Sequence, residues 1–200
     1  MADAKYYPDE WSEYCKFRKS NHQEIEPVWG QFASRYRIAQ AFQRVEFMQL
    51  SEKVSLGYSA GMSLLLSYSA FEMACKAINS NPNQQTVSIF ARDKIKALKV
   101  IRKLYGKTTE SYDLFKHSLT NDKLLKNIDD FIEVRHDNIQ PLCAAVRHLI
   151  AHGHWTPTGS DVLSTSAREA LENMARSLLF TSDNILVHYV ESLKQSSQKS

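Results

Sequence analysis

The histidines of this chain are concentrated in one segment. Of seven in total, four lie between Arg135 and Trp155, namely His136, His148, His152 and His154. Arg147 comes directly before His148. Imidazole gains and loses a proton near neutral pH, and a guanidinium can hold a phosphate through two parallel hydrogen bonds. The combination indicates general acid–base chemistry on a phosphodiester, and the alternative is a polar helix end without a chemical role.

The segment 138–152 has the apolar pattern of an amphipathic helix. At about 100° per residue its apolar side chains share one face, which we expect to pack against the core. These side chains are Ile139, Leu142, Cys143, Val146, Leu149 and Ile150. Arg147, His148 and His152 point away from this face. Gly153 follows at the position where a glycine commonly ends a helix.

The outer face of this helix also carries two small residues, Ala144 and Ala151. Small side chains let a second helix approach closely, so we expect a symmetric homodimer contact here; the alternative is that alanine simply favours a helix on a solvated face. Arg147 and His152 are five positions apart, which corresponds to about 140° around a regular helix. One chain alone would hold them apart. A two-fold axis, or unwinding of the helix at Gly153, would bring them together.

Two other interpretations of these residues remain open. His148 and His152 have the i, i+4 spacing of zinc ligands, and His154 is close by. The segment has neither the glutamate of an HExxH motif nor a clear carboxylate ligand, so we expect no metal site. Glu72 is the only ionisable residue between Val54 and Cys75. It could form a surface pair with Lys76 or orient a residue of the Arg147 cluster.

A row of basic residues lies on the helix that we expect over residues 87–105. Arg92, Lys96, Lys99 and Lys103 recur at steps of four, three and four. Such a row can bind RNA phosphates without sequence preference, and the alternative is a solvated helix face.

The remaining chain predicts the elements that position these residues. Apolar residues recur at three- and four-residue steps and no alternating strand pattern appears, which predicts an all-α, up-and-down helix bundle with additional short helices. We expect one domain of residues 1–200 with frayed ends at about 1–7 and 195–200. The expected helices cover residues 8–19, 27–48, 56–78, 87–105, 110–119, 122–134, 138–152 and 166–194, with a loop at 156–161.

Composition narrows the class of protein further. Hydrophobic residues make up 43% of the chain and the net charge is only +3, which favours a globular domain over a disordered polyelectrolyte. The three cysteines have no finger or disulfide spacing, and the amino terminus has no secretory signal pattern, so we expect a cytoplasmic protein. Serines and glycines interrupt the uncharged stretch 54–71, so we interpret it as a buried helix and expect no membrane partner.

The string Arg147-His148-Leu149-Ile150-Ala151-His152-Gly153 resembles the motif of the HEPN superfamily: an arginine, a polar residue, and a histidine after four to six intervening positions, on a late helix of an all-α bundle. The string from Ser69 to Cys75, which contains Glu72, is similar to the earlier acidic helix that is often found in that family.

The resemblance implies a dimeric, metal-independent ribonuclease that needs no cofactor. Arg147 and His152 of both chains would line a cleft, with His152 as general base or acid and Arg147 stabilising the charged phosphorane. His148 would occupy the polar position after the arginine. The resemblance implies RNA as substrate, and an antitoxin or a nucleotidyltransferase as protein partner. Relatives without catalysis imply the alternative of a nucleotide- or protein-binding module.

Overall fold

The chain forms an all-helical structure, which confirms the predicted fold class. The computed structural model describes residues 4–154 and 164–197, and within them it contains eight α-helices, two short 3₁₀-helices and no strand. The elements are η1 (Ala4–Tyr6), α1 (Trp11–Ser20), α2 (Pro27–Ala41), α3 (Glu52–Ala77), η2 (Pro82–Gln84), α4 (Lys94–Leu104), α5 (Glu110–Ser118), α6 (Asp122–Ile132), α7 (Gln140–Ala151) and α8 (Thr165–Ser197). The predicted loop at 156–161 lies outside the described residues. Helical residues occur in both end regions where we predicted fraying.

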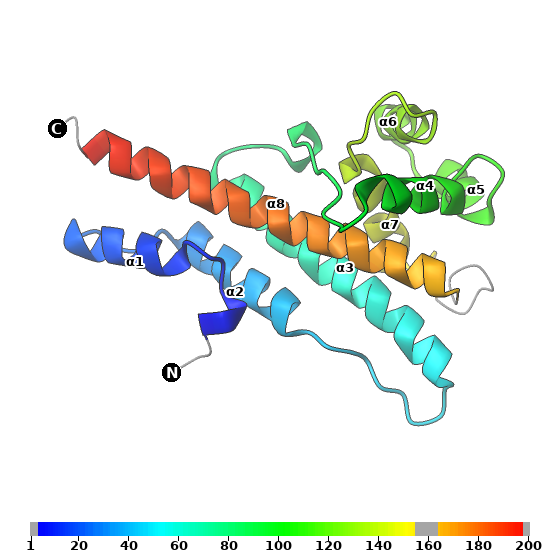
Figure 1. The fold of residues 1–200 in the computed structure, drawn as a ribbon, viewed down its shortest axis with the longest axis horizontal. Coiled ribbons are helices and arrows are strands. Elements are labelled where there is room, and N and C mark those ends of the chain that lie inside the picture. Colours follow the sequence, from blue (N-terminus) through cyan, green and yellow to red (C-terminus); the bar gives the residue numbers. More distant parts are fainter. Residues whose placement is uncertain (1–3, 155–163, 198–200) are drawn as a thin grey trace.

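Helices α3 and α8 are the long central pair of the molecule. They lie against each other along much of their length, and α2 packs on another side of α3 (Figure 1). Close packing is possible because α3 buries many small residues between its large ones; these are Gly57, Ser59, Ala60, Gly61, Ser67, Ala70 and Ala74. None of the helices in the described residues is both long enough and apolar enough to cross a membrane.

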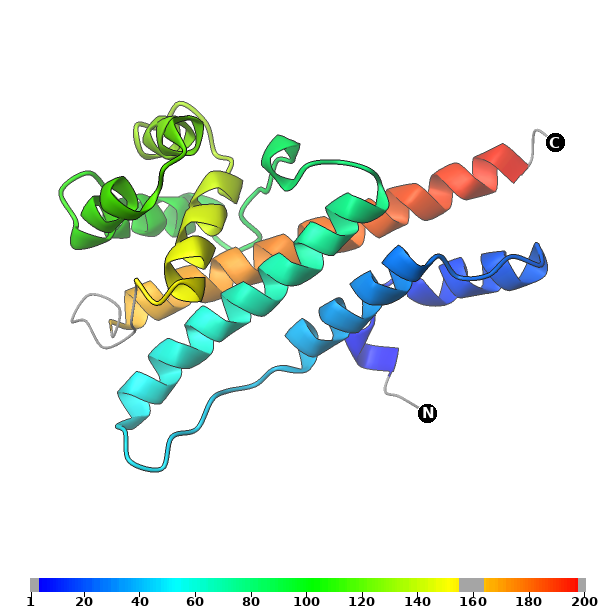
Figure 2. The same ribbon diagram turned by 180° about the vertical axis from the view of Figure 1, so that it is seen from behind.

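Helices α4 to α7 form a separate group on one side of the central pair (Figure 2). Helix α7 packs against α5 and α6 of this group and against α3 of the central pair. The α7 helix begins with Pro141 in its first turn, where proline is favoured because the first amides of a helix have no partner within it. Helix α7 therefore joins the small group to the central pair.

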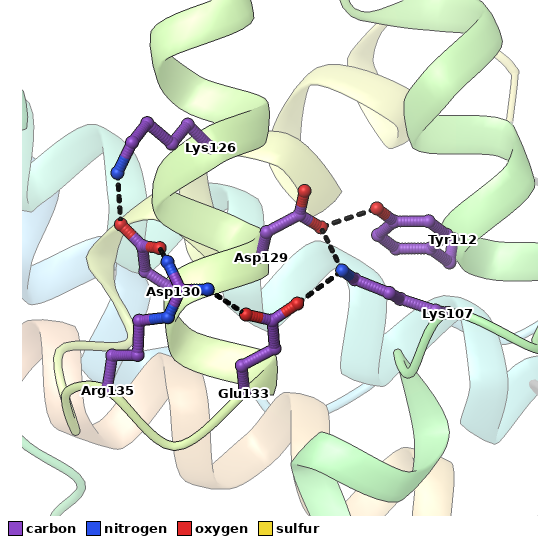
Figure 3. Close-up of polar contacts among 7 residues, drawn as sticks. All are labelled: Lys107, Tyr112, Lys126, Asp129, Asp130, Glu133 and Arg135. Carbon is purple, nitrogen blue, oxygen red and sulfur yellow. Dashed lines mark hydrogen bonds and ion pairs between the residues drawn. The ribbon is translucent and has the colours of Figure 1, made fainter.

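Two polar networks hold α6 and the connection to α7. In the first network, Lys107 forms ion pairs with Asp129 and Glu133 of α6, and the Tyr112 hydroxyl donates a hydrogen bond to Asp129 (Figure 3). Asp130 of α6 forms ion pairs with Lys126 and Arg135. In the second, Arg102 of α4 donates hydrogen bonds to the carbonyl oxygens of Phe131 and His136, and to Asp137. Arg102 thus fixes the start of α7.

The second helix is shorter than we predicted. It ends at Ala41 and not at Met48, and the chain from Phe42 continues in extended form. The physical reason is the tertiary use of this segment, since the Val45 amide donates to Ser59 on α3 at 2.9 Å and Phe47 packs on Tyr58. Met48, the last residue of the predicted helix, is fully exposed.

The basic helix is also shorter than predicted. It begins at Lys94 and not at residue 87, because the Asp93 side chain caps it by accepting a hydrogen bond from the Lys96 amide at 2.9 Å. The preceding segment is fixed by other contacts: the Val87 carbonyl accepts from the Ile139 amide, and the Phe90 amide donates to Ser177.

Four helices end in the same way. After α1, α3, α6 and α7 the chain turns through one residue with positive φ, respectively His22, Asn79, Val134 and Gly153. In each case the next amide bonds back to a carbonyl five residues earlier, which is the Schellman motif. The predicted helix end at Gly153 is confirmed. Val134 is the exceptional member because branched side chains disfavour this conformation.

Candidate functional site

The core face of α7 is the one predicted from the sequence. Leu142, Cys143, Val146 and Leu149 are buried, as is Ile139 just before the helix, whereas Ile150 is half-buried. This face fixes the rotation of α7. As a result Arg147 and His148 lie at the edge of the core, and Ala151 and His152 are exposed.

Arg147 lies against α3. Its guanidinium is 3.7 Å from the Glu72 carboxylate, and it stands over the Tyr68 ring at 5.7 Å from the ring centroid. Of the two alternatives for Glu72, the structure therefore places it beside the Arg147 cluster. The Arg147 and Glu72 side chains are 39% and 36% exposed, so both remain accessible to a ligand.

A pocket of about 240 Å³ opens beside this ion pair. Five parts of the chain contribute to it: α3, η2, the connection between α5 and α6, the first turn of α6, and α7. Its polar lining is Tyr68, Glu72, Asn83, Thr120, Asn121, Arg147 and His148, and its apolar lining is Leu119, Leu124 and Ala144. It therefore combines a cation, a carboxylate, an imidazole and two amides around one open space.

His148 is the histidine that lines this pocket. Burial lowers its pKa from the ordinary 6.5, electrostatic interactions with His152, His154 and Arg147 lower it further, and a backbone hydrogen bond to Ser118 acts in the opposite direction. His148 therefore favours its neutral form near pH 7, which is the form that can accept a proton.

His152 is the residue that follows the last turn of α7. Its ring centroid is 4.4 Å from that of His148 and 6.3 Å from that of His154, and the side chain is exposed. It does not line the pocket. The sequence prediction ranked His152 above His148 as the partner of Arg147, whereas in the structure His148 lines the pocket and His152 is exposed next to His148.

Sequence reasoning missed the hydrogen-bond network that holds two of the pocket residues, Tyr68 and Asn83. Gln140 is buried, and its side-chain nitrogen donates to the Tyr68 hydroxyl at 3.3 Å and to Asn83 Oδ1 at 3.1 Å. Asn138 Oδ1 accepts from the Val87 and Gln140 amides. These residues are distant in sequence, so no periodic pattern connects them. The only local feature in the sequence is a glutamine in the first turn of a predicted helix.

The predicted basic row is divided by the true start of α4. Lys96, Lys99 and Lys103 are exposed on the helix, but Arg92 precedes it. In the part of the chain that the structure describes, no ion pair involves any of these four residues. Nearby Arg102 and Lys107 are engaged in the two networks of α6.

No group of three or more histidine, cysteine or acidic side chains among the described residues is arranged to hold a metal ion. Comparison of the chain with models of known protein families, with curated protein sequences and with solved structures gives no match.

Proposed function

We propose that the chain is a HEPN-like, metal-independent endoribonuclease that cleaves single-stranded RNA in the cytoplasm. One observation carries the proposal: Arg147 and His148 line the same open pocket, and the ring of His152 lies 4.4 Å from that of His148. This arrangement offers an anion-binding group together with two groups that transfer protons. These are the requirements for cleaving a phosphodiester through its own ribose.

In the proposed reaction the ribose 2′-oxygen attacks the adjacent phosphorus. His148, which favours its neutral form, accepts the 2′-hydroxyl proton. The bond between phosphorus and the 5′-oxygen breaks, and His152 in its protonated form donates a proton to that oxygen. The products are a 2′,3′-cyclic phosphate and a 5′-hydroxyl. Arg147 stabilises the negative charge on the phosphorane oxygens, and Glu72 holds the guanidinium in position.

The functional unit in this proposal is a homodimer formed through the outer face of α7. His152 and Ala151 are exposed there, so a second copy could complete the site from the open side. The exposed lysines of α4 would bind the flanking RNA phosphates. In a cell, such an activity requires restraint, for which we propose a separate antitoxin or a nucleotidyltransferase partner.

A second candidate is a catalytically silent module that binds a nucleotide or a protein. The observation that favours it is the Glu72 carboxylate beside Arg147, which partly compensates the positive charge that would stabilise the phosphorane of the cleavage reaction. The two candidates differ in whether the wild-type protein cleaves RNA.

The test is incubation of the purified protein with single-stranded RNA in excess EDTA, followed by analysis of the product ends. We expect cleavage with cyclic phosphate ends, and its loss in Arg147→Ala with unchanged circular dichroism. Absence of wild-type cleavage together with nucleotide binding would favour the silent module. Cleavage that EDTA abolishes would contradict the proposed chemistry.

A further inference from the structure

The pocket beside Arg147 has a feature that the cleavage chemistry does not require. Glu72 and Asn83 face the same space from α3 and η2, together with the apolar side chains of Leu124 and Ala144. Proteins read unstacked RNA bases through hydrogen bonds to their polar edges, with apolar or aromatic groups against their faces. The arrangement of this pocket therefore suits a base as well as a phosphate.

The Glu72 carboxylate has acceptor capacity left for a ligand. Its distance of 3.7 Å to Arg147 is longer than a charged hydrogen bond of about 2.8 Å. No hydrogen bond to Glu72 occurs within residues 4–154 and 164–197. An ionised carboxylate can accept two parallel hydrogen bonds.

The Asn83 amide has the complementary property. Its oxygen already accepts a hydrogen bond from the buried Gln140, which turns the oxygen toward Gln140 and leaves the NH₂ group to donate elsewhere. The pocket thus presents a double acceptor at Glu72 and a donor at Asn83.

We infer that this pocket selects guanine in the RNA substrate, with Glu72 accepting from guanine N1–H and N2–H and Asn83 donating to O6. Guanine is the only common RNA base with two adjacent donors on its pairing edge. Adenine, cytosine and uracil each place an acceptor beside the donor, where it would face the carboxylate. The inference rests on the proposed function, because Arg147 and His148 would hold the phosphate next to this base.

The test is calorimetric titration of the full chain with guanosine 3′-monophosphate and, separately, with adenosine 3′-monophosphate. We expect the guanosine nucleotide to bind at least about tenfold more tightly, as for other paired base contacts. Glu72→Gln should weaken guanosine binding more than adenosine binding, because both nucleotides lose the support that Glu72 gives to Arg147 and only guanosine also loses the paired contact to its base. Asn83→Asp should also weaken guanosine binding, because its carboxylate would repel O6. The control is Glu24→Gln, an exposed glutamate far along the chain in the α1–α2 connection.

Equal affinity of the wild-type protein for both nucleotides would overturn the inference. An equal loss of affinity for both nucleotides in Glu72→Gln would also overturn it, because that result is expected if Glu72 only positions Arg147. These outcomes are separate from the fate of the proposed function. RNA cleavage without base preference would retain the ribonuclease and remove the guanine pocket. Guanosine selectivity without cleavage would retain the pocket and remove the ribonuclease.

Discussion

At the scale of single residues, the environments of His148 and Asp183 shift the pKa of these two side chains in ways that an experiment can test. His148 is half-buried, and burial is the main cause that lowers its pKa and favours the neutral imidazole. Asp183, in the middle of α8, is buried, and burial raises the pKa of its carboxyl to about 6. That value includes the effect of the neighbouring Asp9 and Glu10 carboxylates, which raise the pKa, and of the Asp9 amide, which donates to Asp183 at 2.9 Å and lowers it.

We predict that Asp183 makes the protein less stable as pH rises. Between its ordinary pKa of 3.8 and the folded value of about 6, the native state binds more protons than the unfolded state, so the free energy of unfolding falls across this window. Asp183→Asn should remove that slope and raise the free energy of unfolding at pH 7 by about 1 to 3 kcal/mol. Urea unfolding at pH 4.5 and pH 7 measures the free energy of unfolding at both pH values. The control is Asp113→Asn, which changes an exposed aspartate. A slope that persists in Asp183→Asn would contradict the assignment.

At the scale of elements, the ends of the helices carry specific conformational costs. Val134 ends α6 at φ 63° and its side chain is 67% exposed, so its branched carbon is strained without a packing benefit. Gly153 ends α7 at φ 70°, where glycine is unstrained.

We predict that Val134→Gly raises the free energy of unfolding by about 1 kcal/mol, because it relieves the left-handed strain at an exposed position. Gly153→Ala should lower it by about 1 kcal/mol. No atom lies within 4 Å of an added Cβ at Gly153, so the effect there comes from the backbone alone. Denaturant unfolding of the two variants is the measurement. A destabilised Val134→Gly protein would show that α6 ends differently.

Three exposed lysines of α4, Lys96, Lys99 and Lys103, form no ion pair within the described residues, which fits phosphate binding. We predict that the double change Lys96→Glu and Lys99→Glu weakens RNA binding. It should also reduce the magnitude of the slope of log affinity against log salt concentration by about 1.4, because each of the two lost phosphate contacts to single-stranded RNA accounts for about 0.7 of the slope through counterion release. Fluorescence anisotropy across a salt series measures both. The control makes the same charge change at exposed Lys19 and Lys53; equal effects in the two double variants would leave α4 without a specific role.

Part of this element structure follows from the sequence, and part depends on contacts that sequence patterns do not encode. The core face of α7 and its end at Gly153 were predictable because apolar spacing and glycine act locally. The early end of α2 depends on the bond from Val45 to Ser59, and the late start of α4 on the contacts of Val87 and Phe90. For the same reason the sequence indicated Arg147 and the histidines, but not the link between Asn83 and Gln140.

At the scale of the whole molecule, the central pair α3 and α8 supports a smaller helical group, and α7 connects the two (Figure 1). The exposed outer face of α7 is where the proposed second copy would bind. We predict that the protein sediments at twice the 22.9 kDa of one chain.

In the same measurement Ala151→Arg should sediment as a monomer, because a long charged side chain would prevent close helix approach. The control is Ala41→Arg at the end of α2, where the alanine is also exposed; this variant should remain dimeric. A wild-type protein that stays monomeric at high concentration would contradict the dimer.

The central claim is that Arg147 and His148 make this pocket a metal-independent catalytic site. The most direct test is the single-turnover rate of RNA cleavage in EDTA, measured against pH for the wild type and for His148→Ala. The control is His188→Ala, an exposed histidine on α8. We predict that the acidic limb of the wild-type pH–rate profile lies below pH 6.5, because the pKa of His148 is lowered and its neutral form acts as the base. His148→Ala should lose about a hundred- to ten-thousand-fold in rate, as expected for a general base. An unchanged rate and pH profile in His148→Ala would contradict the account.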